Sequence, residues 1–296
     1  MIGAMIIGFE VFVLQRRIGA PLRRLPFLAF IILSSLVWIV MIYVGLQLGP
    51  MLFGLDAYGG DYGATTLPQD MAFAYGVSIL MNSALRVRTL VGARVLSNFL
   101  VGRYYRPLRE ERIFMFLDLN DSTRLAEKLG DIGVQALLRQ FFYDVADPVV
   151  RYGGETHRYI GDEVVVTWPL RHDYRDQRCI ECVLAIQAGI AKRAPYYTRC
   201  FGVVPEFRVG MHGGPVVASE IGEDKREIVY FGDTINTAAR LGTACKTTRN
   251  AFLISSTLAS EIGLPLSVSA TAVEPLELHG KQEPFQALAL TQAAGA

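Results

Sequence analysis

The 296-residue sequence has few cysteines and almost no net charge. The four cysteines, Cys179, Cys182, Cys200 and Cys245, contain one close pair, and no second pair completes a zinc site. That pair falls in an expected amphipathic helix, so we interpret both residues as structural thiols that a reducing cytosol keeps reduced. The formal net charge is +1, and no basic stripe with interleaved aromatic residues is present. These two features argue against a nucleic-acid partner.

Acidic residues are scarce in the first hundred residues, which instead contain long apolar runs. Leu25 to Leu48 has 24 residues without a charge. As a helix it covers roughly 36 Å, enough to cross a hydrocarbon core of about 30 Å. Met1 to Leu14 and Met71 to Leu85 are shorter, and each spans a membrane only if it packs in a bundle or extends further. We therefore predict a transmembrane helical region over residues 1–86 with about three spans, while one or four spans remain open.

Arginine placement predicts the orientation of these segments. Arginines follow the first and third segments, whereas residues 49–70 contain neither Lys nor Arg. Since short basic loops stay in the cytoplasm, we expect a multi-pass protein of the cell (inner) membrane, in contact with lipid, whose amino terminus is outside and whose remaining chain is cytoplasmic. Met1 to Leu14 lacks the basic start and the cleavage site of a signal peptide.

Polar residues within the apolar segments indicate helix packing or a functional site. Glu10, Asn82 and Ser83 are such residues. Residues 87–111 are predicted to be a connector, with an amphipathic helix from Val87 to Arg106. We hypothesise that the apolar region regulates the domain that follows.

Residues 112–292 are predicted to form an α+β domain with antiparallel strands. A buried strand ends in Asp118, and a hairpin at Gly161 presents Asp162. Two carboxylates that converge from neighbouring strands repel each other unless a cation lies between them, and hard oxygen ligands suit Mg²⁺ or Mn²⁺. The expected elements are a strand at 112–119, helices at about 124–129 and 133–150, a strand at 207–217, and a strand that runs into a helix at 228–241.

Two polar groups flank these elements, and each has two interpretations. Asn120, Asp121, Ser122 and Thr123 are good helix caps, but a helix that starts after a strand also offers free N–H groups to a phosphate. Asn236 and Arg240 are four residues apart, so they share a helix face, which could be a polar face or part of a site.

Four motifs in this order resemble those of class III nucleotidyl cyclases. They are FLDLNDST at 116–123, YIGDE at 159–163, RVGMHGGPV at 208–216 and FGDTINTAARL at 231–241. The resemblance implies a ferredoxin-like βαββαβ catalytic domain that acts as a homodimer with active sites at the interface. It implies two metal ions per site, bound by Asp118, Asp162 and the Leu119 carbonyl. It also implies that Asn236 and Arg240 come from the opposite subunit, where they orient the ribose and stabilise the transferring phosphate.

The resemblance further implies conversion of ATP to 3′,5′-cyclic AMP and pyrophosphate by a membrane-anchored enzyme. The loop 120–123 and Lys281 would contact the substrate phosphates. The positions that read adenine in the family hold Arg158 and Val229 here, where Lys and Asp or Thr are usual. Arg158 can donate to adenine or guanine, and Val229 has no side-chain acceptor. ATP is favoured over GTP because of its frequency in the family.

The sequence bears differently on four other functions. A catalytically silent nucleotide-binding or dimerisation module is favoured by the altered base-reading positions and opposed by the intact catalytic ones, and a guanylate cyclase remains open. A diguanylate cyclase is disfavoured because Thr156 and His157 follow Gly153-Gly154-Glu155 where that signature needs Glu-Phe. A P-loop enzyme is excluded because Gln282 follows Gly280-Lys281. We interpret His157, His212 and Glu163 as structural residues.

Overall fold

The computed structural model of the chain describes residues 26–53, 67–170, 176–277 and 284–293. The chain divides into two compact units, one ending at Val101 and one beginning at Gly102. Each unit is described by itself.

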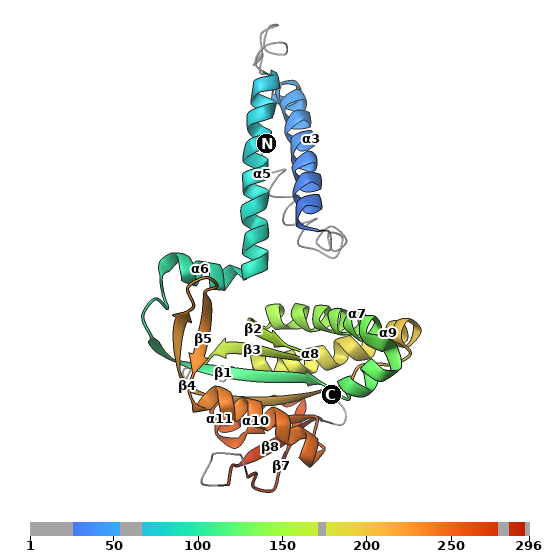
Figure 1. The fold of residues 1–296 in the computed structure, drawn as a ribbon, viewed down its shortest axis with the longest axis vertical. Helices are drawn as coiled ribbons and strands as arrows, with labels where there is room; N and C mark the ends of the chain where they lie inside the picture. The colour runs from blue at the N-terminus through green and yellow to red at the C-terminus, as the bar shows by residue number, and fades with distance from the viewer. Residues whose placement is uncertain (1–25, 54–66, 171–175, 278–283, 294–296) are drawn as a thin grey trace. The chain divides into compact units, whose positions relative to one another are not determined.

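The first unit contains a pair of long helices whose interface includes polar side chains. In Figure 1, α3 (Phe27–Phe53) lies beside α5 (Leu67–Val91). Asn82 of α5 is buried and donates hydrogen bonds to the Ser78 carbonyl at 2.8 Å and to Ser35 Oγ of α3 at 3.4 Å. The polar group expected at Asn82 therefore serves helix packing, as small polar residues do between apolar helices.

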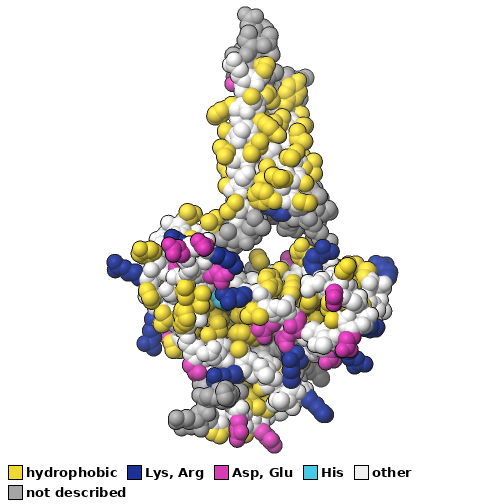
Figure 2. Space-filling view, viewed as in Figure 1, with side chains coloured by type: hydrophobic (Ala, Val, Ile, Leu, Met, Phe, Trp, Pro, Cys, Tyr) yellow, Lys and Arg dark blue, Asp and Glu magenta, His cyan; other side chains and the backbone are white. Residues whose placement is uncertain are grey.

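The outer surface of this helix pair is apolar. Figure 2 shows hydrophobic side chains over much of it. Large apolar side chains point outward, while the buried residues of the pair include serines and an asparagine as well as Phe30, Ile31 and Trp38. An exterior this apolar is unusual for a helix pair in water. The exposed side chains include Leu28, Ile32, Leu36, Val40, Phe73, Val77 and Leu80.

One helix of the described residues, α3, is long and apolar enough to cross a membrane, over Phe27–Val44. The segment expected at Met71 to Leu85 lies in α5, which carries Asp70, Arg86 and Arg88 and is less apolar. The segment expected at Met1 to Leu14 lies outside the described residues. The multi-pass prediction is therefore not supported by the part of the chain that the structure describes.

The connector differs from the single helix predicted over Val87 to Arg106. α5 continues to Val91, and a separate helix, α6 (Ala93–Val101), follows. Gly92 lies between them with a φ of 91°, a conformation that a helix cannot contain and that glycine adopts most readily.

The second unit is an α+β domain whose sheet has the order β2-β3-β1-β4-β6-β8-β7, with β5 paired to β4. The four strands β2, β3, β1 and β4 are antiparallel neighbours in the βαββαβ order of a ferredoxin-like fold, which confirms the predicted class. The elements are β1 Leu108–Leu119, α7 Ser122–Arg151, β2 Glu155–Ile160, β3 Glu163–Pro169, α8 Arg178–Lys192, α9 Ala194–Phe201, β4 Phe207–Ile221, β5 Glu227–Phe231, α10 Asp233–Thr248, β6 Phe252–Ser255, α11 Ser256–Ile262, β7 Val268–Ala272 and β8 Ala287–Gln292.

The two helices predicted before β2 form one kinked element. α7 runs through both predicted segments, and Gly130 interrupts it with a φ of 70° and a ψ of 168°. The expected break between residues 129 and 133 is therefore present at this glycine.

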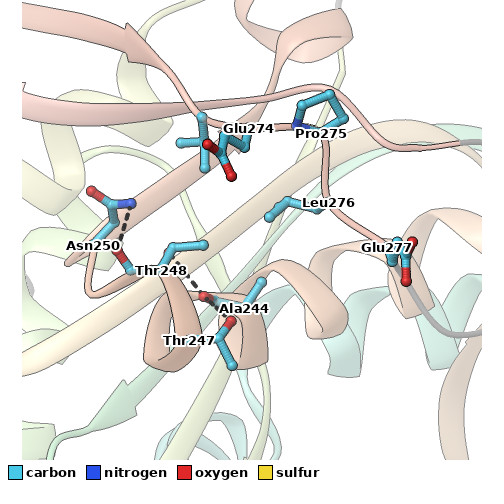
Figure 3. Close-up of a pocket in the computed structure, with 9 residues that line it drawn as sticks. Ala244, Thr247, Thr248, Asn250, Glu274, Pro275, Leu276 and Glu277 are labelled. Carbon is cyan, nitrogen blue, oxygen red and sulfur yellow. Dashed lines mark hydrogen bonds between the residues drawn. The ribbon is translucent and has the colours of Figure 1, made fainter.

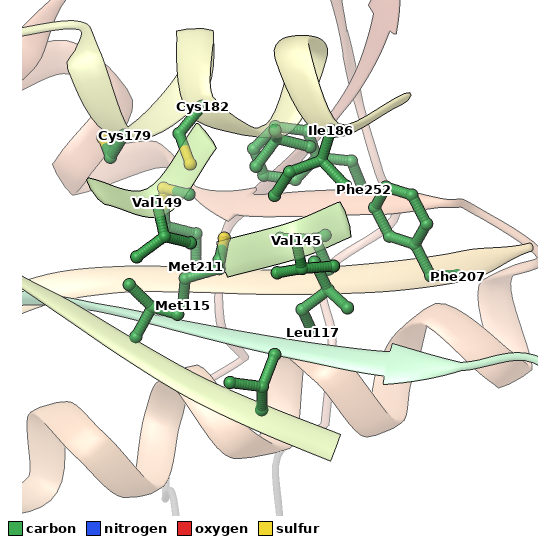
Figure 4. Close-up of a cluster of buried hydrophobic side chains, with 14 of the residues drawn as sticks. Met115, Leu117, Val145, Val149, Cys179, Cys182, Ile186, Phe207, Met211 and Phe252 are labelled. Atoms are coloured by element: carbon green, nitrogen blue, oxygen red, sulfur yellow. The ribbon is translucent and has the colours of Figure 1, made fainter. Parts of the chain in front are cut away.

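The main core lies between one face of the sheet and α7 and α8. Alternate residues of β1 point into it, among them Met115 and Leu117, as strand alternation requires. Figure 4 shows these residues packed with β4 and with the apolar face of α8, which contributes Cys179 and Cys182. Burial raises the pKa of both thiols, that of Cys182 to about 12, so neither carries a reactive thiolate near neutral pH.

α10 covers the opposite face of the sheet. It packs so closely on β4 that a Cβ added to Gly210 would lie 2.0 Å from the backbone nitrogen of Gly242. Gly242 in turn lies against Phe116 of β1. The even-numbered residues of β1 therefore face α10, and Asp118 belongs to this set.

Candidate active site

Asp118 lies near the end of β1, on the face of the sheet that carries α10. Its strand partners are Glu163 on β3 and Arg208 on β4. Arg208 donates hydrogen bonds to Asp118 Oδ2 from Nε at 3.0 Å and from Nη2 at 2.6 Å. Lys246 of α10 places its Nζ 3.9 Å from the same oxygen. The carboxylate thus has two cations of its own chain beside it.

Asp162 is brought next to Asp118 by the β2–β3 turn. Gly161 in this turn has a φ of 62°, and the Leu119 N–H donates to the Asp162 carbonyl at 3.4 Å. Burial raises the pKa of Asp118, the Arg208 hydrogen bonds lower it, and the nearby Asp162 carboxylate raises it again. The structure therefore places the two predicted metal carboxylates together, as the sequence analysis expected.

Glu163 adds a third carboxyl group to this corner of the sheet. Burial, followed by repulsion from Asp118 and Asp162, raises its pKa to about 7.

Within the described residues, no group of three or more His, Cys, Asp or Glu side chains is arranged to hold a metal ion. Metal binding by Asp118, Asp162 and the Leu119 carbonyl stays a prediction. The donor chemistry fits it, because two carboxylates and a carbonyl are hard oxygen ligands that leave room for phosphate and water.

The loop between β1 and α7 leaves the first turn of the helix uncapped by a side chain. Asp121 is the N-cap residue, with a left-handed backbone at φ 53° and ψ 33°, and its side chain accepts no hydrogen bond from the helix. The capping interpretation of this loop is therefore not realised at Asp121. Backbone N–H groups at Ser122 and Thr123 begin the helix, which is the arrangement that attracts phosphate.

Asn236 and Arg240 lie on α10, away from the carboxylates. Asn236 is exposed and Arg240 is half-buried, while Thr237, Ala238 and Leu241 face the domain. Lys246, near the end of the same helix, is the residue that reaches Asp118. At 1.5 Å per residue, Arg240 and Asn236 lie about 9 and 15 Å back along the helix axis from Lys246.

Arg158 and Val229 lie on β2 and β5 respectively. Arg158 forms an ion pair with Glu227 of β5, two residues before Val229. Val229 pairs with Ser219 of β4 and is half-buried. Lys281 lies outside the described residues.

A separate pocket of about 440 Å³ lies at the end of α10 and does not contain any of the predicted site residues. Figure 3 shows its lining, in which Thr247 and Thr248 donate hydrogen bonds to the Ala244 carbonyl. Glu274 and Glu277 also line it and would repel a triphosphate. This pocket is not the site that the motifs indicate.

Comparison with known proteins identifies the family. Residues 106–288 match the model of the adenylate and guanylate cyclase catalytic domain. The chain belongs to this family. It is a cyclase, which in chemical terms is a lyase, and its catalytic domain contains all the motifs from which the resemblance was drawn.

Relatives and solved structures agree with this assignment. The cyclase is 37% identical to "Adenylate cyclase 2" of Rhizobium meliloti over 97% of its own chain and 80% of that protein. The fold matches the adenylyl cyclase CyaB from P. aeruginosa, with 19% identity, a TM-score of 0.56, and coverage of 64% of this chain and 98% of that one. It also matches the guanylyl cyclase Cya2, with 21% identity, a TM-score of 0.54, and coverage of 64% and 95%.

Three charged residues that contact predicted site residues were not predicted from the sequence. Arg208 opens the RVGMHGGPV motif, and pairing that strand with the one ending in Asp118 could have suggested its contact. Glu227 shares a strand face with Val229, so alternation could have found it. No sequence signal marks Lys246, because its approach to Asp118 depends on how α10 packs on the sheet.

Proposed function

We propose that the chain is an adenylate cyclase that converts ATP to 3′,5′-cyclic AMP and pyrophosphate at a homodimer interface. The observation that carries the proposal is the approach of Asp118 and Asp162 at the uncapped start of α7. Two carboxylates beside free helix N–H groups suit a metal–triphosphate substrate. The relative in Rhizobium meliloti named adenylate cyclase supports ATP as the nucleotide.

The roles of the residues follow from their chemistry. Asp118, Asp162 and the Leu119 carbonyl would hold two Mg²⁺ or Mn²⁺ ions, which lower the pKa of the ribose 3′-hydroxyl and neutralise the leaving pyrophosphate. The backbone N–H groups of Asp121, Ser122 and Thr123 bind the phosphates, because the N–H of Asn120 already donates to the Glu206 carbonyl at 2.8 Å. Arg240 places its guanidinium against the charge that grows on the transferring phosphate, and Asn236 orients the ribose by hydrogen bonding.

A second copy of the chain would complete each site. Within one chain the carboxylates lie near Lys246 at one end of α10, while Asn236 lies toward the other end and Arg240 near the middle. A dimer that sets the α10 of one copy over the carboxylates of the other supplies both halves to one nucleotide. The separation of the two groups within one chain supports this arrangement.

A product assay tests the proposed reaction. The purified full-length protein is offered ATP and GTP separately, with Mg²⁺ and with Mn²⁺, and the cyclic products are identified by mass. We expect cyclic AMP from ATP. Cyclic GMP alone would instead indicate a guanylate cyclase, and no cyclic product from a folded, dimeric protein would indicate the silent module.

We further propose that the first unit anchors the cyclase in the membrane by α3, alone or with α5. The apolar outer face of this helix pair supports contact with lipid. The test compares the full-length chain with a variant that lacks residues 1–85 in membrane fractions washed with carbonate. The proposal requires the full-length chain to stay with the membrane and the shortened one to be released.

A further inference from the structure

The Arg158–Glu227 ion pair connects two strands that are not neighbours in the sheet. β2 lies at one edge of the sheet, whereas β5 pairs with the end of β4. Arg158 Nη2 of β2 contacts Glu227 Oε2 of β5. The two side chains therefore meet across the face of the sheet, although the strand order does not make β2 and β5 neighbours.

The packing beneath this ion pair holds it in place. Arg112 is buried and pairs with Glu155 of β2 at 3.0 Å, and its guanidinium lies 5.0 Å from the ring centroid of Tyr230 on β5. The His157 ring contacts the same tyrosine edge to face at 5.1 Å. Because these contacts join β2 to β5, the positions of Arg158 and Glu227 do not depend on their own attraction.

The ion pair itself is open to solvent. The Arg158 and Glu227 side chains are 44% and 35% exposed. A pair this exposed contributes little to stability, so the fold does not require it. Lys225 contacts the other carboxylate oxygen of Glu227 at 2.6 Å, and these cations lower the pKa of Glu227, which stays an acceptor at neutral pH.

We propose that Glu227 reads the 6-amino group of adenine, together with Arg158, and replaces the acceptor that Val229 lacks. The proposal rests on the proposed function, because it assigns a base to the same nucleotide site. Glu227 and Val229 lie on one face of β5, two residues apart, so Glu227 offers a carboxylate acceptor on the strand face where valine has none. Adenine presents a donor at N6 beside an acceptor at N1, so a carboxylate and a guanidinium held side by side match it.

The experiment measures binding and does not depend on turnover. Full-length wild type, Glu227→Ala and Lys225→Ala are titrated with Mn²⁺ present, and ATP, GTP and purine riboside 5′-triphosphate compete with a fluorescent ATP derivative. Purine riboside triphosphate differs from ATP only in having hydrogen in place of the 6-amino group. Lys225→Ala is the matched control because it removes a partner of Glu227 and leaves Arg158 in place.

We expect wild type to bind ATP about tenfold or more tightly than purine riboside triphosphate, as a hydrogen bond to a charged group requires. In Glu227→Ala this ratio should fall to about one, while Lys225→Ala should keep it. An unchanged ratio in Glu227→Ala overturns the inference, as does a wild type that prefers GTP or fails to distinguish the two purines. Cyclic AMP formation is assayed separately, so an inactive protein with the expected binding ratios would reject the proposed function alone.

Discussion

Arg208 donates to one oxygen of Asp118 through two nitrogens, at 3.0 and 2.6 Å. Its Nη2 also lies 3.5 Å from the Leu119 carbonyl. One guanidinium thus contacts both predicted metal ligands of β1. In the protein without metal, Arg208 acts as the counter-ion of a carboxylate that Asp162 and Glu163 would otherwise repel.

Replacing this arginine should lower stability and alter its dependence on cations. We expect Arg208→Met to lower the free energy of unfolding in EDTA by about 1–3 kcal/mol, because it removes both hydrogen bonds to a half-buried carboxylate and leaves the more distant Lys246 beside it. Added Mn²⁺ should restore more stability in this variant than in wild type, since no guanidinium competes for Asp118. Urea unfolding with and without Mn²⁺ measures both effects.

Arg226→Met is the control, because the Arg226 side chain is 61% exposed in its ion pair with Glu220. We expect this exposed change to stay within about 0.5 kcal/mol of wild type. Similar behaviour of the two variants would show that Arg208 is not the counter-ion described.

Removing either predicted metal carboxylate should abolish turnover. Asp118→Asn and Asp162→Ala should each lower cyclic AMP formation by about 10³-fold or more and leave the circular dichroism spectrum unchanged. Asp147→Asn serves as control, because Asp147 lies on the surface of α7 in an ion pair with Arg151. An active Asp162→Ala enzyme would reject the metal assignment.

Mixed dimers should recover activity if each site takes residues from two chains. Asp118→Asn and Arg240→Ala are inactive alone in this proposal, but a heterodimer of the two contains one intact site. An equal mixture that exchanges subunits freely should regain about a quarter of the wild-type rate, since half of the dimers are mixed and each has one of two sites. A mixture that stays inactive, despite subunit exchange shown by energy transfer, would place the whole site in one chain.

His157 should make stability depend on pH. Burial, followed by repulsion from Arg158 and Arg112, lowers the pKa of His157 to about 4 from a usual 6.5. Between these values the unfolded chain binds a proton that the folded chain does not, so stability is lost as the pH falls. Between about pH 7.5 and pH 5, wild type should lose about 2 kcal/mol more than His157→Gln, as measured by urea unfolding. Parallel pH profiles for the two proteins would contradict this effect.

The close packing of α10 on β4 predicts a large loss of stability when a single methyl group is added at Gly210. Gly210→Ala should lower the free energy of unfolding by about 3 kcal/mol or more, because the new Cβ meets backbone that cannot move without shifting the helix. Gly189→Ala in α8 is the matched control, since its Cβ would meet nothing within 4 Å. Thermal unfolding should show no loss for the control, and equal losses would mean that helix packing is not the cause.

Much of the fold could be read from local patterns. Most strands and helices between residues 112 and 241 were predictable because alternation and turn glycines are local signals, as at Gly161 and Gly130. The later elements β6, α11, β7 and β8 were not predicted. The break at Gly92 was missed because the amphipathic pattern continues on both sides of it. Hydropathy alone also did not decide the number of membrane spans. Polar side chains lower the mean hydropathy of α5, yet one of them, Asn82, faces α3 and forms a hydrogen bond with it.

The sequence by itself determined the family, the ferredoxin-like order and the residues that could carry the chemistry, because these depend on residue type and on spacing along the chain. Only the tertiary structure decided which charges meet. Arg208 reaches Asp118 through strand register, Lys246 reaches it through the packing of α10, and Arg158 meets Glu227 across the face of the sheet. Such pairs are distant in sequence, and their energy depends on separations of a few ångströms that no local pattern encodes.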